Sequence, residues 1–567
     1  MYNLPQLIYG APASLSRLLQ DLDITTINAP DIKKIIKSGV SRSLITNIDI
    51  PPLLTALDML QMTDIVTNII GLRITLKINL HATTQIINHT LSSDNLLLAY
   101  TNGYRAIHNG IYTSRVDYCV NNMLRDAFAN GLRITRVINQ NPESINDNLL
   151  SYFPSLFDLD ADNSYKITTL VPFAKTLQKL SLCKRSDRNI SSISNRELEL
   201  CTSLIELYVD NNTRISTCEP FAHTLRILSA QGTSVICDES LQLCDKIEYL
   251  NATNNEQITT CAPFAPTLET LIAENKSAIC DNGLTLCNHI TVLYADDNPR
   301  ITTCAPFAQS LNTLHAMSNC GIGDVGLALC TSLRILYASN NSNITTCDPF
   351  ARTLRTLVTR DTSGGLTDAG LSRCVSIEFL DASDNLHITT CNPFGKTLTT
   401  LYAYGRSGIM DSGLRKCVAI TELSADNNTQ IRTCTPFAKS LRTLYAQDRC
   451  GICDEGLSQC TSITELHASF NRDITTCAPF AKSLRVLYAQ SVGRHVWRPV
   501  HNQCGMCDAG LTQCTNLREL YITDNANITS CAPFAKSLRV LRAEMYGDMY
   551  HDAMKLCTKS LLQYQPN

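Results

Sequence analysis

Hydrophobic and polar positions alternate in a short pattern that recurs through most of this chain of 567 residues. The pattern reads L-x-x-L-x-A-x-x-N-x-x-I, and one copy places it at Ile420, Leu423, Ala425, Asn428 and Ile431. Such alternation puts the apolar side chains on one face of a short strand. A single strand cannot bury that face alone, so neighbouring copies must stack to form a core. The pattern therefore predicts a solenoid of short parallel strands.

A longer phrase sets the period of the solenoid. It reads Cys-Ala-Pro-Phe-Ala-Lys-Ser-Leu at Cys477, and its variants begin at Cys218, Cys261, Cys304, Cys347, Cys391, Cys434 and Cys531. From Cys218 to Cys477 the copies are 43 or 44 residues apart, and each period splits into steps of 17 and about 26 residues. The step to Cys531 is 54 residues, so roughly eleven residues are inserted there. We predict about 18 repeats in nine pairs.

This pattern resembles the leucine-rich repeat family over about residues 153–557. Phrases such as the one from Ile452 to Cys460 look like the cysteine-containing subtype, and the uniform array resembles repeat proteins of large DNA viruses of amoebae. The resemblance implies an α/β solenoid, a horseshoe with a parallel concave sheet and short helices or turns on its convex side. The repeat asparagines should form an inner ladder that satisfies backbone groups; they are Asn212, Asn255, Asn298, Asn341, Asn385, Asn428, Asn471 and Asn525.

The extent of the repeat array divides the chain into three predicted regions. We predict an N-terminal capping region over residues 1–125, of mixed or helical structure, a repeat array over 126–557 and a tail over 558–567. The first ten residues lack a basic segment before their apolar stretch, so we expect no signal peptide. No apolar run is long enough to span a bilayer, and we expect no membrane insertion.

The net charge and the cysteine content limit the classes of partner and the cellular compartment that we expect. The net charge is −3, which gives no reason to expect nucleic acid as a partner. There are 26 cysteines, but Phe153 and Leu170 replace the junction cysteines in the first copy. An apolar residue can replace a buried thiol but not a metal ligand or a disulfide partner. We therefore expect buried thiols, no metal, no cofactor and an intracellular, cytoplasmic location.

Several short segments of the sequence resemble motifs of catalytic or metal-binding sites. Gly321 to Gly326 matches a dinucleotide fingerprint, and Phe394 to Thr397 imitates a phosphate loop, but both occupy ordinary repeat positions. The pairs Cys450/Cys453 and Cys504/Cys507 have zinc-like spacing but lie two repeats apart, roughly 10 Å at the usual strand spacing. A redox or metal role for these cysteines stays open. We predict that the protein is not an enzyme and has no catalytic residues.

Tyrosine dominates the positions that should face the concave side. The residue between the second leucine and the alanine points away from the core, and seven of these eighteen positions are tyrosine. Tyrosine is enriched in binding interfaces, although strand propensity alone could place it there. The predicted binding residues of this row are Tyr294, Tyr337, Tyr402, Tyr445, His467, Tyr488 and Tyr521. Arginines before the strands and aspartates after them could also pair with each other and only keep the face soluble.

The inserted segment, Ser491 to Gln503, adds a second candidate site. It contains Trp497, the only tryptophan, beside Arg494 and Arg498. These residue types are enriched at binding hot spots, so we predict that the three residues bind the partner. The alternative is a tolerated insertion whose tryptophan packs against the neighbouring repeat.

Three functions fit these observations. The first is a non-catalytic scaffold that binds a protein on its concave face and inserted rim loop. The second is a substrate receptor of a ubiquitin ligase with an F-box-like N-terminal region. The third is a structural or surface protein of a virion or cell envelope. An enzyme confined to residues 1–125 is the least supported, and the sequence does not indicate the oligomeric state.

Overall fold

The computed structural model describes residues 136–137, 146–151, 154–185, 191–361, 363–491 and 503–543. The chain divides into two compact units, Met1–Ile258 and Thr259–Asn567, which we call the N-terminal and C-terminal units. The predicted capping region 1–125, the inserted residues 492–502 and the tail 558–567 lie outside the described residues. The predicted domain boundaries stay predictions.

Each repeat contributes one short strand, and neighbouring strands within each unit pair in parallel in the order of the sequence. The strands of the N-terminal unit are β1 (Arg136–Val137), β2 (Asp158–Asp160), β3 (Lys179–Ser181), β4 (Glu206–Tyr208), β5 (Ile227–Ser229) and β6 (Tyr249–Asn251). Those of the C-terminal unit are β7 (Thr270–Ile272), β8 (Val292–Tyr294), β9 (Thr313–His315), β10 (Ile335–Tyr337), β11 (Thr356–Val358), β12 (Phe379–Asp381), β13 (Thr400–Tyr402), β14 (Glu422–Ser424), β15 (Thr443–Tyr445), β16 (Glu465–His467), β17 (Val486–Tyr488), β18 (Glu519–Tyr521) and β19 (Val540–Arg542).

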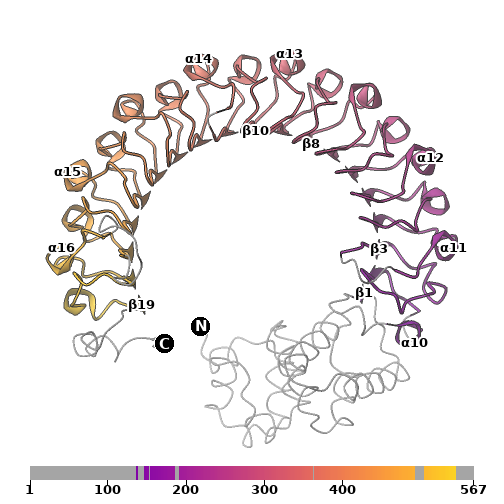
Figure 1. Cartoon of the computed structure of the whole chain (residues 1–567), viewed down its shortest axis with the longest axis horizontal. Helices are drawn as coiled ribbons and strands as arrows, with labels where there is room; N and C mark the ends of the chain where they lie inside the picture. The colour runs from indigo at the N-terminus through magenta and orange to yellow at the C-terminus, as the bar shows by residue number, and fades with distance from the viewer. Residues whose placement is uncertain are drawn as a thin grey trace, which may run out of the picture. The chain divides into compact units, whose positions relative to one another are not determined.

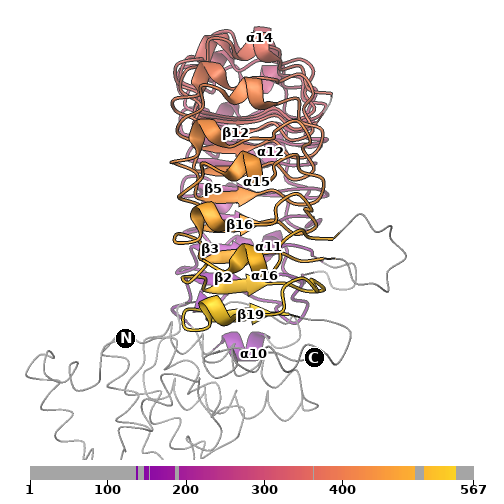
Figure 2. The ribbon, with the colours of Figure 1, turned by 90° about the vertical axis from the view of Figure 1, so that its left-hand side faces the viewer.

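Every strand from β2 to β19 has a leucine at its centre, and these leucines are buried. The first and third residues of a strand point to the opposite face because side chains alternate along a strand. In the C-terminal unit the strands line the inner side of the curve, as β8, β10 and β19 show, while helices α13 to α16 lie on the outer side (Figure 1). The view turned by 90° shows β12, β16 and β19 of this unit one above another (Figure 2). The predicted leucine-rich repeat solenoid with a parallel sheet is confirmed.

The return segments carry single helical turns of two kinds. One kind begins after a cysteine and contains the Pro-Phe pair, whose proline suits the first turn because it needs no amide donor there. These turns are η2 (Glu219–Phe221), η3 (Ala262–Phe264), η5 (Ala305–Phe307), η6 (Asp348–Phe350), η7 (Asn392–Phe394), η9 (Thr435–Phe437), η10 (Ala478–Phe480) and η11 (Ala532–Phe534). Each places its phenylalanine in the core.

The other kind ends in a buried leucine. It forms α11 (Asn195–Leu198), α12 (Asp238–Leu241), η4 (Asp281–Leu284), α13 (Asp324–Leu327), α14 (Asp368–Leu371), η8 (Asp411–Leu414), α15 (Asp454–Leu457) and α16 (Asp508–Leu511); α10 (Asp147–Leu150) precedes β2.

The asparagine ladder predicted from the sequence is confirmed. The Asn341 amide donates to the carbonyls of Ala316 (2.7 Å) and Ile322 (3.1 Å), and its oxygen accepts the Asn343 backbone N–H (2.9 Å). The eight ladder asparagines are at most 3% exposed. Each one donates to the backbone carbonyl of the residue directly after the preceding strand, where the chain leaves the sheet.

Packing explains the glycines that imitate nucleotide-binding motifs. A Cβ atom on Gly326 would lie 2.1 Å from the carbonyl oxygen of Thr302, and one on Gly395 would lie 2.5 Å from that of Lys416. Gly456 and Gly510 occupy the same repeat position as Gly326, with a carbonyl oxygen 2.0 Å from the Cβ that each lacks. These glycines allow neighbouring repeats to approach closely, which agrees with their interpretation as ordinary repeat positions.

The junction cysteines form part of the core. Of the 24 cysteines in the described residues, 20 are buried; the partly exposed ones are Cys237, Cys280, Cys453 and Cys507. Thiols also meet in pairs, such as Cys304 with Cys330, and their hydrogen bond together with burial raises the pKa of Cys304. Leu170, which replaces a junction cysteine, is fully buried too. The predicted burial of the thiols is therefore confirmed.

Candidate binding face of the curved sheet

The strand register of the C-terminal unit aligns the third residue of each strand into a continuous row. Tyr294 pairs with His315 and His315 with Tyr337, across β8, β9 and β10. Further along, the same register aligns Tyr445, His467, Tyr488 and Tyr521 across β15 to β18. We call this the aromatic row. Each of these side chains lies on the face opposite the leucine core.

Rings of the aromatic row stack on one another in two groups. In the first group, His315 lies between Tyr294 and Tyr337, with centroids 4.0 Å from each. In the second, the centroid separations along Tyr445, His467, Tyr488 and Tyr521 are 4.2, 4.1 and 4.1 Å. Strands are about 4.8 Å apart at the backbone. The rings are closer because side chains converge on the inner side of a curved sheet.

Tyr402 is predicted to belong to the same row but stands apart from both stacks. Asp381 and Ser424 occupy the row on its two neighbouring strands. Its ring instead meets the edge of Phe379, with centroids 5.3 Å apart and planes inclined by 74°. The structure therefore brings six of the seven predicted residues into two stacks and separates the seventh.

Stacking covers the ring faces, and several tyrosine hydroxyl groups form hydrogen bonds with acidic side chains. Three tyrosine hydroxyls donate to glutamates at the first positions of strands: Tyr402 to Glu422 (2.8 Å), Tyr521 to Glu519 (3.1 Å) and Tyr208 to Glu206 (3.0 Å). Burial together with these bonds raises the pKa of Tyr402 and Tyr521 to about 12. Burial lowers the pKa of His315 to about 4, so this ring is neutral near pH 7.

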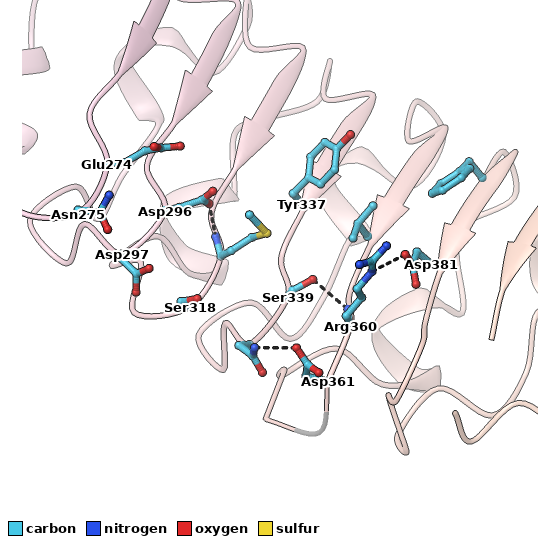
Figure 3. Close-up of a pocket in the computed structure, with 14 residues that line it drawn as sticks. Glu274, Asn275, Asp296, Asp297, Ser318, Tyr337, Ser339, Arg360, Asp361 and Asp381 are labelled. Carbon is cyan, nitrogen blue, oxygen red and sulfur yellow. Dashed lines mark hydrogen bonds and ion pairs between the residues drawn. The ribbon is translucent and has the colours of Figure 1, made fainter. Parts of the chain in front are cut away.

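A hollow of about 650 Å³ opens beside Tyr337, where the first stack ends (Figure 3). The small side chain of Val358 follows Tyr337 in the row, and Phe379 lies on the next strand. Five acids and one arginine contribute charge to the lining; they are Glu274, Asp296, Asp297, Asp361, Asp381 and Arg360. The Arg360 Nε donates to Asp381 at 2.5 Å, and the Asp381 side chain is only 1% exposed. A guanidinium group therefore already lies on this face against a buried carboxylate.

Burial and charge repulsion both change the pKa of acids that line the hollow. Burial raises the pKa of Glu274, and the nearby charges of Asp296 and Asp297 raise it further. Asp296 accepts the Met317 N–H (2.7 Å) and Asp361 accepts the Asn340 amide (2.8 Å). Among the described residues, no salt bridge reaches Glu274, Asp296, Asp297 or Asp361. The hollow is a region of negative potential.

The arginine and aspartate rows lie at opposite ends of the strands. Arginines such as Arg226 and Arg355 come one residue before a strand, and their ion pairs are with Glu248 and Glu378 of the same row. An aspartate such as Asp426 comes two residues after a strand and accepts a backbone N–H, here from Gln447 (2.7 Å). The alternative in which the two rows pair with each other is therefore wrong for Arg226 and Arg355.

Sequence reasoning missed other residues of this face. The pattern also places His315 in the row, but its stacking between two tyrosines follows only from the ring distances. The glutamates Glu422, Glu465 and Glu519 lie at first strand positions, which point to the same face as the third positions. That alternation was the signal that could have identified them. The predicted binding residues Arg494, Trp497 and Arg498 lie outside the described residues.

No cluster of three or more His, Cys, Asp or Glu side chains in the described ranges is placed to hold a metal ion. No helix in the same ranges has the length and apolar character needed to cross a bilayer.

The comparisons with known proteins yield matches among solved structures only. No protein-family model and no curated protein sequence matches the chain. An internalin, InlF, from Listeria monocytogenes is 19% identical, covers 56% of this chain and 86% of its own, and has a TM-score of 0.38. A TLR13–ssRNA13 complex gives 14% identity, 76% of each chain and a TM-score of 0.41.

A third structure is described as the functional domain of InlJ from Listeria monocytogenes, which includes a cysteine ladder. It is 16% identical, covers 65% of this chain and 74% of its own, and has a TM-score of 0.34. The strand register, the buried leucines and the asparagine ladder of the chain itself define its fold as a leucine-rich repeat solenoid. Both the viral character of the array and the cysteine-containing subtype stay predictions.

Proposed function

We propose that this protein is a non-catalytic scaffold that binds a protein partner on the sheet face of its C-terminal unit. The observation that carries the proposal is the second stack, Tyr445, His467, Tyr488 and Tyr521, whose rings lie on the sheet face opposite the leucine core. Rigid aromatic side chains provide contact area at small cost in conformational entropy. Stacking fixes their rotamers before binding, which lowers that cost further.

A protein fits this face better than a nucleic acid does. The glutamates beside the tyrosines and the acids of the hollow make the face negative. A phosphate backbone would be repelled by such a surface. We therefore retain a protein as the partner, although one structure with similar repeats is a complex with single-stranded RNA.

Site-specific photocrosslinking tests the proposal. A photoreactive phenylalanine derivative at Tyr445 should crosslink a defined partner in cells that express the protein. The same derivative at Glu455, which is exposed in α15 on the outer side of the curve, is the matched control. Equal crosslinking from both positions, or from Glu455 alone, would contradict the proposal.

The variant Tyr402→Ala/Tyr445→Ala/Tyr488→Ala gives a second measurement. It should keep the circular dichroism spectrum of the wild type and lose most of the capture of the crosslinked partner. Unchanged capture would leave strand propensity as the better explanation of the tyrosines.

We also propose an intracellular, reducing location. The support is the core position of the thiols, which an apolar residue, Leu170, can occupy equally well. A thiol reagent should modify few of the 26 cysteines in the native protein and nearly all after unfolding. Disulfides in protein isolated from its natural compartment would contradict this location.

A further inference from the structure

Three glutamates follow the aromatic row on alternate strands of the C-terminal unit. They are Glu422 on β14, Glu465 on β16 and Glu519 on β18. Each carboxylate is held by an aromatic residue: Glu422 by Tyr402 (2.8 Å), Glu465 by His467 (2.8 Å) and Glu519 by Tyr521 (3.1 Å). The three side chains therefore form a regular, partly exposed line of negative charge beside the rings.

The N-terminal unit shows how such a glutamate binds a cation. Lys179 lies opposite Glu206 in the strand register, and its ammonium group is 2.7 Å from the carboxylate. The same ammonium group is 5.2 Å from the centroid of the Tyr208 ring, whose hydroxyl donates to Glu206. A cation held by a carboxylate and an aromatic ring is thus a combination that this repeat geometry accommodates.

In the C-terminal unit the position of that lysine is occupied by residues without charge. Thr443 lies opposite both Glu422 and Glu465, and Val486 lies opposite both Glu465 and Glu519. Among the described residues, no lysine or arginine forms a salt bridge with these three glutamates. The carboxylates keep the geometry of the cation site. His467 adds a positive charge beside Glu465 only when it is protonated, and the Arg542 guanidinium lies 5.7 Å from the centroid of the Tyr521 ring.

The spacing of the three glutamates fits a partner in the polyproline II conformation. Carboxylates on alternate strands are about 9–10 Å apart at the backbone and somewhat closer at the level of the stacked rings. A polyproline II helix has three residues per turn and rises about 9 Å per turn, so every third side chain points the same way at that spacing. A β-strand places side chains of one face about 7 or 13 Å apart and does not match.

We propose that the partner presents an extended basic segment with lysine or arginine at every third residue, which lies across β14 to β18. One cationic side chain contacts each of Glu422, Glu465 and Glu519, and the turns between them pack against the edges of Tyr445, His467 and Tyr488. This inference rests on the proposed function and names the chemistry of the partner. The acidic hollow beside Tyr337 extends the negative face toward β10 and would attract further basic residues.

A designed peptide tests the spacing directly. The full-length protein is titrated into a fluorescein-labelled peptide of four Lys-Pro-Pro repeats, and anisotropy gives the dissociation constant at low salt. A peptide of the same composition with its four lysines adjacent is the control, together with a Gln-Pro-Pro repeat. We expect the repeat peptide to bind roughly tenfold more tightly than the clustered one, and its affinity to fall as salt rises.

Matched variants locate the site. Glu465→Gln should weaken the Lys-Pro-Pro peptide by about threefold, and the triple Glu→Gln variant at 422, 465 and 519 by roughly 30-fold, as expected for exposed ion pairs. Glu455→Gln removes the same charge from the outer side of the same repeat and should change nothing. Thr443→Lys keeps every carboxylate but places a lysine where Lys179 lies opposite Glu206; it should also weaken binding. Circular dichroism and thermal melting verify that each variant is folded.

The outcomes separate this inference from the proposed function. Equal affinity for the two lysine peptides, or affinity indifferent to the glutamate variants, overturns the inference. Tighter binding of single-stranded oligouridine, lost in the same variants, also overturns it. If the photoreactive group at Tyr445 still crosslinks a partner in any of these cases, the proposed function stands and only the chemistry assigned to the partner is wrong.

Discussion

Tyr488 and Tyr521 lie face to face, with ring centroids 4.1 Å apart and planes inclined by only 3°. They belong to neighbouring strands, β17 and β18, although roughly eleven more residues separate these strands than separate others in the array. Val486, Leu487 and Tyr488 pair in register with Glu519, Leu520 and Tyr521, as in the other strand pairs of the C-terminal unit. The strand register, and not the length of the connection, therefore determines the aromatic row.

The asparagine ladder should be a major source of stability. Replacing Asn341 with alanine removes donors to the Ala316 and Ile322 carbonyls and the acceptor of the Asn343 N–H, all buried. The expected loss is roughly 1–3 kcal/mol, the cost of buried polar groups without partners. Chemical denaturation measures it. The exposed Asn312→Ala variant is the control and should change stability by less than about 0.5 kcal/mol; equal stabilities of the two variants would refute the role of the ladder.

Substitution of Gly456 or of Gly364 by alanine tests whether glycine is needed where neighbouring repeats approach closely. The Cβ of a Gly456→Ala variant would lie 2.0 Å from the Arg432 carbonyl oxygen, so backbone must move. We expect a loss of roughly 1–3 kcal/mol, as for overpacked cores. The nearest atom to a Cβ on Gly364 is 3.6 Å away, so Gly364→Ala should be tolerated. Thermal melting compares the two; similar losses in both would contradict the packing argument.

Phe470 should be a strained residue. Its φ is 63°, in the left-handed region, where the equivalent positions of other repeats hold Asn427 (59°) or Asp384 (56°). Bulky residues pay more than asparagine for this conformation. Phe470→Asn should therefore raise the free energy of unfolding by roughly 0.5–1 kcal/mol. The reverse change, Asn427→Phe, should lower it; a Phe470→Asn variant that is less stable than the wild type would show that side-chain contacts outweigh the strain.

His315 should make stability fall in mild acid. Burial lowers its pKa from 6.5 to about 4 in the folded state, so the unfolded chain binds a proton first. The stabilisation is complete above pH 6.5 and is lost as the pH falls toward 4. Asp160, whose burial raises its pKa to about 6, acts in the opposite direction.

A variant separates the effect of His315 titration on stability from the effects of titrating carboxylates such as Asp160. His315→Phe keeps an aromatic ring between Tyr294 and Tyr337 but cannot titrate. The difference between the melting temperatures of wild type and variant should change between pH 6.5 and 4. A constant difference across this range, or an NMR titration of His315 near its ordinary pKa, would show that the ring is not desolvated.

The repetitive elements could be predicted from the sequence because one rule applies to each copy. Leucine at the centre of a strand, asparagine after it and phenylalanine on the return turn recur with a fixed period, and stacking allows them only one environment. The direction of the third strand residue follows from alternation alone, so Tyr445 and Tyr488 were correctly placed on the sheet face.

The parts that break the repeat could not be predicted in this way. Whether Tyr402 joins a stack depends on its neighbours Asp381 and Ser424 across the sheet, and the stacking role of His315 depends on ring distances near 4 Å. The hollow beside Tyr337 combines side chains from six consecutive repeats, those of β7 to β12, and it includes Arg360, whose pairing with Asp381 has no counterpart in the period. Such features depend on the residues that differ between repeats. A consensus pattern describes only the residues that the repeats share, so it contains no information about these features.

The rungs of the asparagine ladder also determine how the chain would respond to a pulling force. Asn428 bonds to Ala403 and Asn471 to Ala446, so each rung ties a repeat only to its neighbour along the array. Under tension applied to its ends, the C-terminal unit should unravel from the ends inward, one repeat pair after another. Each event would release 43 residues, which is roughly 140–150 Å of extended chain. The molecule would then act as an extensible tether whose force–extension curve shows a ladder of nearly equal steps.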